Sequence, residues 1–296
     1  MPAATTHAEF AKRVYDELDE SIKKKITSMP MYYLGAQGPD LLLFHRYMFL
    51  PNSLNQYGSL MHREKVKEAI AYFRRHALTP SLRSYFLGYL THYALDSTAH
   101  PIIYAYAKRE SEEEGISQNE AHFRIEGEVD AWILNQSGRS VHDYSIYRML
   151  RISKEEVKEL ARMYHGLFEE VYAMNIPAKL FEGACHDCMR ITRQLKPGNI
   201  KHRVVRTMET MVRVPHLVTS MMLTDKENAE PSVLNPDHEE WVYYGVFNAS
   251  FPELFDQAKD YAKKLMADPQ ESLLKKNFAG IPFGETVLSD DSSSAL

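Results

Sequence analysis

Several residue types and patterns that define large protein classes are rare or missing in this chain of 296 residues. Cys185 and Cys188 are the only cysteines, and two cysteines are too few for a disulfide framework. No segment approaches the run of about eighteen apolar residues that a membrane-spanning helix needs. A net charge of −5 gives no support to a nucleic-acid-binding surface built from bulk positive charge. The sequence therefore predicts a globular protein without a transmembrane segment.

Residues 1–20 also lack a basic region followed by an apolar core, so we find no secretory signal and expect a cytoplasmic protein. Cys185 and Cys188 form the sequence Cys-His-Asp-Cys inside a helical stretch, which would suit a redox pair or half of a zinc site. The chain has no second cysteine pair that would complete a four-cysteine zinc site. Structural cysteines are therefore the favoured interpretation.

Glycine is scarce, with 13 residues, and almost every window has the apolar spacing of a helix rather than the alternation of a strand. The sequence therefore predicts an all-α fold. We find no internal repeat and no dividing linker, so we expect one helical domain over residues 1–285 and a disordered tail over residues 286–296. The helix over residues 62–76 is rich in lysine and arginine, so we expect it to face solvent and assign its histidines no role. Helices are predicted over residues 10–26, 39–49, 62–76, 79–100, 119–136, 154–173, 178–195, 201–223 and 251–266.

The helix predicted over residues 79–100 carries three metal-competent side chains, His92, Asp96 and His100. Positions four and eight residues apart fall on one helical stripe, so the three side chains leave a largely apolar helix on a common face. Pro101 disfavours the helical conformation at His100, so we expect the helix to end or kink there. Two partly buried histidines and an aspartate that align by chance would give the same triplet.

The spacing limits how this triplet would bind a metal. The outer Cα atoms would lie roughly 12 Å apart along the helix axis, whereas histidine nitrogens bind zinc at about 2.0–2.1 Å. One ion held by all three side chains would be strained. A carboxylate midway between two histidines is better placed to bridge two ions about 3.5–4 Å apart, each completed by residues from other helices.

A second helix, in the stretch NEAHFRIEGEVDAWILNQ, repeats the pattern with His122, Glu126 and Asp130. Two separate stripes of histidine and carboxylate would arise by chance far less often than one. Neither stripe contains the Glu-x-x-His pair of di-iron helix bundles, which argues against an oxidase centre. The sequence therefore predicts a metal centre between two helices.

Two regions before these helices supply further candidates. Pro39 suits the first position of a helix, which places Asp40 in its first turn and His45 one and a half turns later. A carboxylate in a first turn also has a structural role, because it complements the positive end of the helix dipole. His7 lies close to the predicted start of the first helix.

The motifs HYALDSTAHP and HFRIEGE together resemble the H-x-x-x-D, H and H-x-x-x-E arrangement of the zinc-dependent phospholipase C proteins, which are related to the S1/P1 nucleases. The segment GAQGPD and the early Thr-His also resemble that family, and NPDHEEW followed by SFPELFDQA does so more weakly. The resemblance covers most of the chain. It implies a mostly helical fold of the phospholipase C/P1 nuclease type with a cluster of up to three zinc ions.

The resemblance also implies which residues bind the ions. A first ion would be held by Asp40, His45, His92 and Asp96. A second ion would be held by His100, His122 and Glu126, and a third by His7 together with Asp96. The chain departs from the family in three respects. The spacings from Asp96 to His100 and from Asp40 to His45 are shorter, and the second of these makes His62 an alternative ligand to His45. The chain also begins Met1-Pro2 where the secreted enzymes use an N-terminal tryptophan as a ligand of the third ion.

Ligation by histidines and carboxylates suits zinc, or iron and manganese, rather than a thiolate-selecting metal. A cluster of two or three such ions can lower the pKa of a bridging water to near neutrality and clamp phosphoryl oxygens during in-line displacement. We therefore expect a metal-dependent phosphoric ester hydrolase in which metal-bound hydroxide is the nucleophile and Asp40 orients or deprotonates it. The substrate would be a small phosphate ester or a phospholipid.

A nuclease of the P1 type is a second hypothesis, with nucleic acid as substrate only. It needs aromatic side chains that stack on bases. Aromatic residues at the available positions are more often part of the core than of a pocket. The candidates are Tyr32, Tyr33, Phe44, Tyr47 and Tyr93.

Two further hypotheses place the metals differently. The pairs His142-Asp143 and His186-Asp187 are the dyads found in helical HD phosphohydrolases, although isolated dyads are a weak signal. In a non-catalytic protein, metals would only fix helices together. An open coordination position would favour catalysis, whereas closed four-ligand sites would favour the structural role.

Overall fold

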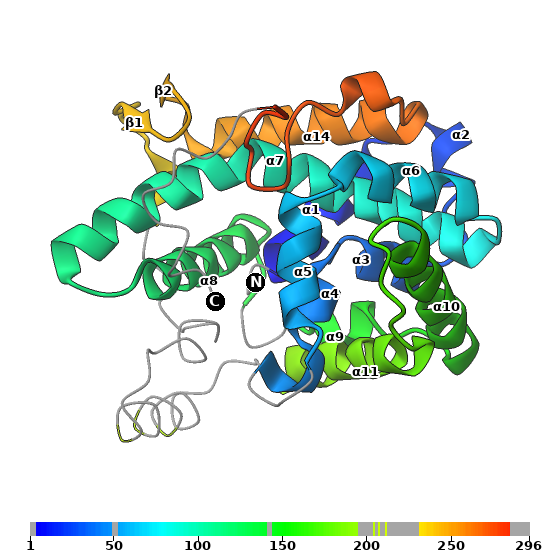
Figure 1. Cartoon of the computed structure of the whole chain (residues 1–296). Helices are drawn as coiled ribbons and strands as arrows, with labels where there is room; N and C mark the ends of the chain where they lie inside the picture. Colours follow the sequence, from blue (N-terminus) through cyan, green and yellow to red (C-terminus); the bar gives the residue numbers. More distant parts are fainter. Residues whose placement is uncertain are drawn as a thin grey trace.

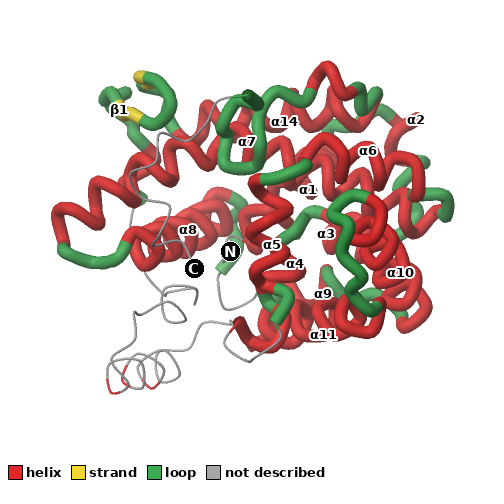
Figure 2. The backbone as a smooth tube through the Cα atoms, viewed as in Figure 1, coloured by secondary structure: helices red, strands yellow, loops and turns green. Residues whose placement is uncertain are grey.

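Helices make up almost all of the regular structure in the computed structural model, which describes residues 4–48, 53–140, 144–194 and 231–284 and the single positions 204, 207 and 211 (Figure 2). The predicted all-α fold is confirmed. The helices are α1 (Ala4–Asp16), α2 (Glu20–Lys23), α3 (Met29–Gly35), α4 (Asp40–Leu43), α5 (Asn55–Arg63), α6 (Val66–His76), α7 (Pro80–Glu114), α8 (Gln118–Gln136), α9 (Ile146–Met149), α10 (Lys154–Glu170), α11 (Ala178–Gln194) and α14 (Phe251–Ala267). The other described elements are the 3-10 helices η1 (His45–Met48), η2 (Ser232–Leu234) and η3 (Glu271–Leu273) and the strands β1 (Trp241–Val242) and β2 (Val246–Phe247).

Helix α7 runs through the middle of the molecule, and α3, α8 and α14 pack along it (Figure 1). Its start follows from the sequence, because the Thr79 side chain accepts the Leu82 N–H and Pro80 occupies the first turn. Its end follows too, because Gly115 adopts the left-handed conformation with φ 69° that glycine tolerates. The middle turns are buried on almost all sides, so polar side chains there face other parts of the interior.

Helix α7 does not end at His100 as predicted but continues through Pro101 to Glu114. Proline removes one backbone hydrogen bond and crowds the preceding turn. Here the turn is covered, because a Cβ added to Gly280 would lie 2.4 Å from Pro101 Cγ and 3.2 Å from the Ser97 carbonyl oxygen. Tertiary packing thus holds the helix together where the local preference would end it.

Helices α3 and α7 approach each other so closely that two glycines are required. A Cβ on Gly35 would lie 2.0 Å from the Tyr85 carbonyl oxygen, and a Cβ on Gly88 would lie 1.9 Å from the Tyr32 carbonyl oxygen. Any larger residue at either position would force the helices apart. This crossing brings the turn that follows α3 against the middle of α7.

Two of the predicted helices are divided. The helix predicted over residues 62–76 is interrupted at Lys65, which has φ 52°, so His62 belongs to the last turn of α5. Helix α6, which follows, buries five side chains and does not face solvent throughout as predicted. The helix predicted over residues 10–26 is also divided, since α1 ends at Asp16 and α2 covers only Glu20–Lys23. The predicted apolar stripe of this region is nevertheless buried at every position, namely Phe10, Val14, Leu18, Ile22 and Ile26.

The remaining predictions agree to different degrees. Helices α8, α10, α11 and α14 start and end within three residues of the predicted bounds, whereas the helix predicted over residues 39–49 is replaced by α4 and η1. The antiparallel β1–β2 pair was not predicted, because two residues per strand are too few for a periodic signal. Residues 201–223 lie almost entirely, and residues 286–296 entirely, outside the described part of the chain.

None of the described helices combines the length and the apolar character required to cross a membrane. The cytoplasmic location and the single domain stay predictions.

Candidate metal centre

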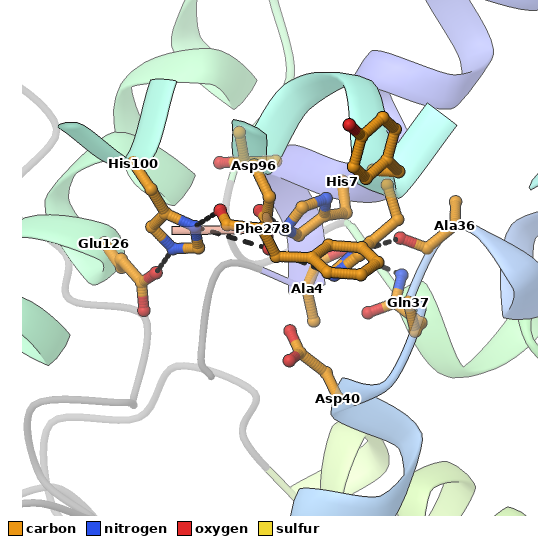
Figure 3. A network of polar contacts seen from close by, with 12 residues as sticks. Ala4, His7, Ala36, Gln37, Asp40, Asp96, His100, Glu126 and Phe278 are labelled. Atoms are coloured by element: carbon orange, nitrogen blue, oxygen red, sulfur yellow. Dashed lines mark hydrogen bonds and ion pairs between the residues drawn. The ribbon is translucent and has the colours of Figure 1, made fainter. Parts of the chain in front are cut away.

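Helices α7 and α8 pack together and bring the two predicted stripes into contact. The Nε2 atoms of His100 and His122 lie 3.3 Å and 3.1 Å from the same oxygen, Glu126 Oε1. All three side chains are buried. Figure 3 shows His100 between Asp96 on one side and Glu126 on the other. We call His100, His122 and Glu126 the two-helix group.

Asp96 lies at the centre of a second cluster, in which imidazoles from several elements approach one carboxylate. His7 Nε2, on α1, lies 3.2 Å from Asp96 Oδ1. His92 Nε2 and His100 Nδ1, both on α7, lie 3.1 Å and 3.3 Å from Oδ2. His62 Nε2, on α5, lies 3.7 Å from the same oxygen. A carboxylate with nitrogen neighbours on both oxygens is suited to bridging two cations.

Asp40 joins this cluster from the first turn of α4, directly after the turn that follows α3. Its Oδ1 lies 3.1 Å from His62 Nε2, and the residue is 2% exposed. Gly38 allows the turn to lie here, because it has φ 52° and an added Cβ would lie 2.2 Å from the His92 ring. We call His7, Asp40, His62, His92 and Asp96 the Asp96 group.

Backbone carbonyl groups fix the orientation of three imidazoles. A carbonyl oxygen only accepts hydrogen bonds, so the ring Nδ1 that faces it carries the hydrogen. The opposite nitrogen, Nε2, then presents a lone pair, which is the form in which histidine binds a metal. The Nδ1–carbonyl distances are 3.1 Å for His92 and Ala36, 2.8 Å for His62 and Gly58, and 3.1 Å for His100 and Phe278.

Several buried polar atoms of these side chains have no hydrogen-bond partner among the described residues. They include His62 Nε2 with the facing Asp40 Oδ1, and His92 Nε2 with the facing Asp96 Oδ2. Buried polar atoms are almost always hydrogen-bonded, and an unpaired buried charge is costly. A cation would satisfy these atoms together, so the side chains fit a metal. The ligand atoms lie within 4.8 Å of one another in three sets: His7, His92 and Asp96; Asp40, His62 and His92; and His100, His122 and Glu126.

The electrostatics of the centre point the same way. Burial alone would raise the pKa of Asp96, but the imidazoles of His100, His92 and His7 hold it well below its usual range. Burial alone would lower the pKa of His100, but Asp96 and Glu126 raise it to about 9. Without a metal, a proton on His100 compensates part of the carboxylate charge, whereas burial lowers the pKa of His92. Metal binding would replace the proton on His100.

The family model for zinc dependent phospholipase C matches residues 6–173. The chain belongs to that family. All members of the two-helix group and the Asp96 group lie within the matched residues, whereas Phe278 lies beyond them. No curated protein and no solved structure matches the chain. The resemblance inferred from the two helical motifs is therefore confirmed.

In this member of the zinc-dependent phospholipase C family, the predicted ligand His45 does not lie beside Asp40. His45 Nδ1 accepts the Leu54 N–H at 3.0 Å, and a Cβ on Gly183 of α11 would lie 3.2 Å from His45 Nε2. The prediction assumed one helix through both residues, but the backbone turns between α4 and η1, and Arg46 has φ 53°. His62, the alternative ligand, occupies the place beside Asp40.

Asp130 continues the stripe of α8 but has a different role. It accepts hydrogen bonds from the Thr6 N–H at 2.7 Å, the Thr6 hydroxyl at 2.6 Å and the Thr5 N–H at 3.3 Å. Burial raises the pKa of Asp130 to about 7, although these hydrogen bonds oppose the rise. Asp130 thereby anchors the first turn of α1, and this contact places His7 beside Asp96.

None of the remaining candidate residues that the structure describes belongs to either group. His142-Asp143 falls outside the described residues, His186 is exposed, and Asp187 accepts the Arg46 N–H at 2.9 Å. Cys185 and Cys188 are buried and free, and burial raises the pKa of Cys185 to about 12. These cysteines have the surroundings of structural residues.

Proposed function

We propose that the protein is a zinc-dependent phosphoric ester hydrolase that acts on a phospholipid. The family supports a zinc-dependent hydrolase of the phospholipase C type. The observation that carries the proposal is the convergence of unpaired buried Nε2 and carboxylate oxygen atoms within the part of the chain that matches this family. A purely structural role would not need so many ligand atoms around one carboxylate.

The two groups would hold two or three zinc ions. In the Asp96 group, Asp40, His62, His92 and Asp96 would hold one ion, and His7 would join Asp96 on the third. The two-helix group would hold the other, with Glu126 between its two histidines. Bound zinc would supply positive charge to a phosphoryl group and lower the pKa of a water molecule. Iron or manganese would fit the same ligands.

The protein's own side chains would orient the reacting groups. Asp40 is buried beside the other members of the Asp96 group, and a carboxylate in this place can accept a proton or position a water molecule. His62 holds Asp40 from one side at 3.1 Å, and its own Nδ1 is fixed by the Gly58 carbonyl. We therefore assign to Asp40 the role of orienting the nucleophile.

A P1-type nuclease is the second candidate, and one observation favours it. The Tyr104 ring lies 4.8 Å from the His122 ring and stacks on Tyr243 with an interplanar angle of 7°, so an aromatic surface borders the two-helix group. Tyr32, Phe44 and Tyr93 are fully buried in the core and are not available to stack on bases. The side chain of Tyr47 lies outside the described residues. The net charge of −5 favours a phospholipid over a polyanionic nucleic acid.

The test compares three substrates after the metal content of the purified protein has been measured. We expect cleavage of short-chain phosphatidylcholine, and weaker cleavage of single-stranded DNA and of a nitrophenyl phosphodiester. The His92→Ala and Asp96→Asn variants should lose the zinc of the Asp96 group and the activity together. His186→Ala is the matched control, because that histidine is exposed on α11 and belongs to neither group.

The outcomes separate the candidates. Cleavage of DNA alone would favour the nuclease. Zinc retained by the Asp96 group in the double variant His92→Ala/Asp96→Asn would overturn the proposal, because both substitutions remove atoms that the ions of this group need.

A further inference from the structure

Residues 275–284, which follow α14 and η3, form a closed loop against the metal centre. Within the loop, the Asn277 N–H donates to the Ile281 carbonyl at 2.9 Å, and the Ile281 N–H donates to Asn277 Oδ1 at 3.0 Å. The Phe283 N–H donates to the Lys275 carbonyl at 3.0 Å, so the two ends of the loop are joined. We call residues 275–284 the clasp loop. It lies more than 100 residues beyond the end of the family match at residue 173.

The clasp loop is attached to the helices that carry the ligands. The Tyr93 hydroxyl, on α7, donates to the Lys276 carbonyl at 2.7 Å. The Phe278 N–H donates to the carbonyl of His62 on α5 at 3.2 Å. Gly280, with φ 77°, rests directly on Pro101. These three attachments fix Phe278 between α5 and α7.

Phe278 contacts the metal centre in two ways. Its carbonyl oxygen lies 3.1 Å from His100 Nδ1, and Asp96 Oδ2 lies 3.3 Å from the same nitrogen. Both oxygens are acceptors, so Nδ1 carries a hydrogen, and Nε2 is the nitrogen that faces Glu126 Oε1 at 3.3 Å. The Phe278 ring is fully buried and lies 5.1 Å from the His62 ring and 5.5 Å from the His92 ring.

We propose that the clasp loop is a positioning element of the metal centre, in which the Phe278 carbonyl selects the ring tautomer of His100 and the Phe278 ring holds His62 and His92 in place. The proposal rests on the zinc centre of the proposed function. It makes zinc affinity depend on a segment outside the matched residues. Phe278 is a positioning residue, because it contacts the histidines and not the substrate.

The test uses two glycine variants of the full-length protein. In Gly280→Ala, the new Cβ would lie 2.4 Å from Pro101, so the loop has to move away from α7 and take the Phe278 carbonyl with it. Gly284→Ala is the matched control, because Gly284 also has a positive φ, of 94°, but an added Cβ has no atom within 4 Å. Changes in the contacts around metal ligands typically lower metal affinity about 10–100-fold. We expect this loss for Gly280→Ala and no change for Gly284→Ala in a chelator competition with zinc.

A second readout follows the tautomer in metal-free protein. Nitrogen-15 spectra of the histidine side chains, assigned with a His100→Gln variant and recorded at a pH at which the ring is neutral, should show the hydrogen of wild-type His100 on Nδ1. In Gly280→Ala this preference should be lost. Circular dichroism checks that the variant keeps its helices, and if Gly280→Ala does not fold, Asn277→Ala loosens the loop without a clash and is measured in the same way.

The outcomes distinguish this proposal from the proposed function. Wild-type protein that binds no zinc contradicts the proposed function, while the tautomer of His100 still tests the clasp loop. Wild-type zinc affinity and an unchanged tautomer in Gly280→Ala would overturn the role of the clasp loop and leave the hydrolase intact.

Discussion

The two halves of the metal centre are assembled in different ways. The two-helix group takes all its side chains from α7 and α8, which follow each other in the chain and pack together. The Asp96 group collects side chains from α1, α4, α5 and α7. Helix periodicity therefore nearly determines the first group, whereas the second exists only when four elements have taken their places. We expect the two groups to respond differently to substitution, pH and loss of packing.

The largest effect on zinc binding is expected for Asp96→Asn, because the Asp96 carboxylate faces four imidazoles. Three of these belong to its own group, and the fourth, His100, belongs to the two-helix group. We expect zinc affinity of the Asp96 group to fall by more than about 100-fold, beyond the effect typical of indirect contacts. The two-helix group should weaken much less. Zinc content after dialysis measures both, and Asp256→Asn on the exposed side of α14 is the control. Equal losses from both groups would show that they are not separate.

A smaller effect, confined to one ion, is expected for His62→Ala. This variant removes a nitrogen that faces both Asp40 and Asp96, so the Asp96 group should lose zinc while the two-helix group keeps it. His45→Ala is the matched control, because His45 is also a buried histidine near Asp40 in the sequence but has its Nδ1 bound to the Leu54 N–H. Loss of zinc in His45→Ala and not in His62→Ala would reverse this assignment.

The pH dependence of the metal-free protein should report on His100. Its pKa is raised from 6.5 to about 9, so its protonated form stabilises the fold fully below about pH 6.5, and this contribution is lost as the pH rises through about 9. Urea unfolding with a chelator present should therefore show stability falling between these values. In His100→Gln this part of the decrease should be absent, and a variant with the same pH profile as the wild type would contradict the prediction.

The smallest effect on zinc binding is expected for Asp130→Asn, because Asp130 lies outside both groups. The pKa of Asp130 is raised from 3.8 to about 7, so its ionisation costs stability as the pH rises through this range. An asparagine oxygen still accepts the two Thr6 hydrogen bonds. We expect the free energy of unfolding of the variant, relative to that of the wild type, to rise by on the order of 4 kcal/mol from pH 4 to pH 8, measured by urea unfolding, since the shift is about three pKa units and one unit is about 1.4 kcal/mol. Zinc content should not change.

The sequence is informative wherever the ligands share a helix. His92, Asp96 and His100 on α7, and His122 and Glu126 on α8, follow from a four-residue spacing that helix geometry converts into a common face. The all-α fold and the bounds of the long helices follow from the same periodicity. Asp40 can be predicted from the sequence too, because glycine and proline mark the turn before it.

The sequence is uninformative where packing decides. His62 stands alone in its helix, and only the packing of α5 on α4 brings it to Asp40, so composition alone suggested a solvated surface. Pro101 predicted a helix end, but buried contacts with the loop at Gly280 keep α7 continuous. Phe278 lies 178 positions from His100, and no periodic signal spans that separation.

The most direct test of the two-group centre is the zinc content of the wild type compared with that of Glu126→Gln. Glu126 is the only carboxylate among the three members of the two-helix group and lies within 3.3 Å of both histidines. We expect at least two zinc ions per chain in the wild type and the loss of one in the variant, with the Asp96 group still loaded. A wild type without zinc, or a variant that loses every ion or none, would contradict a centre built from two separate groups.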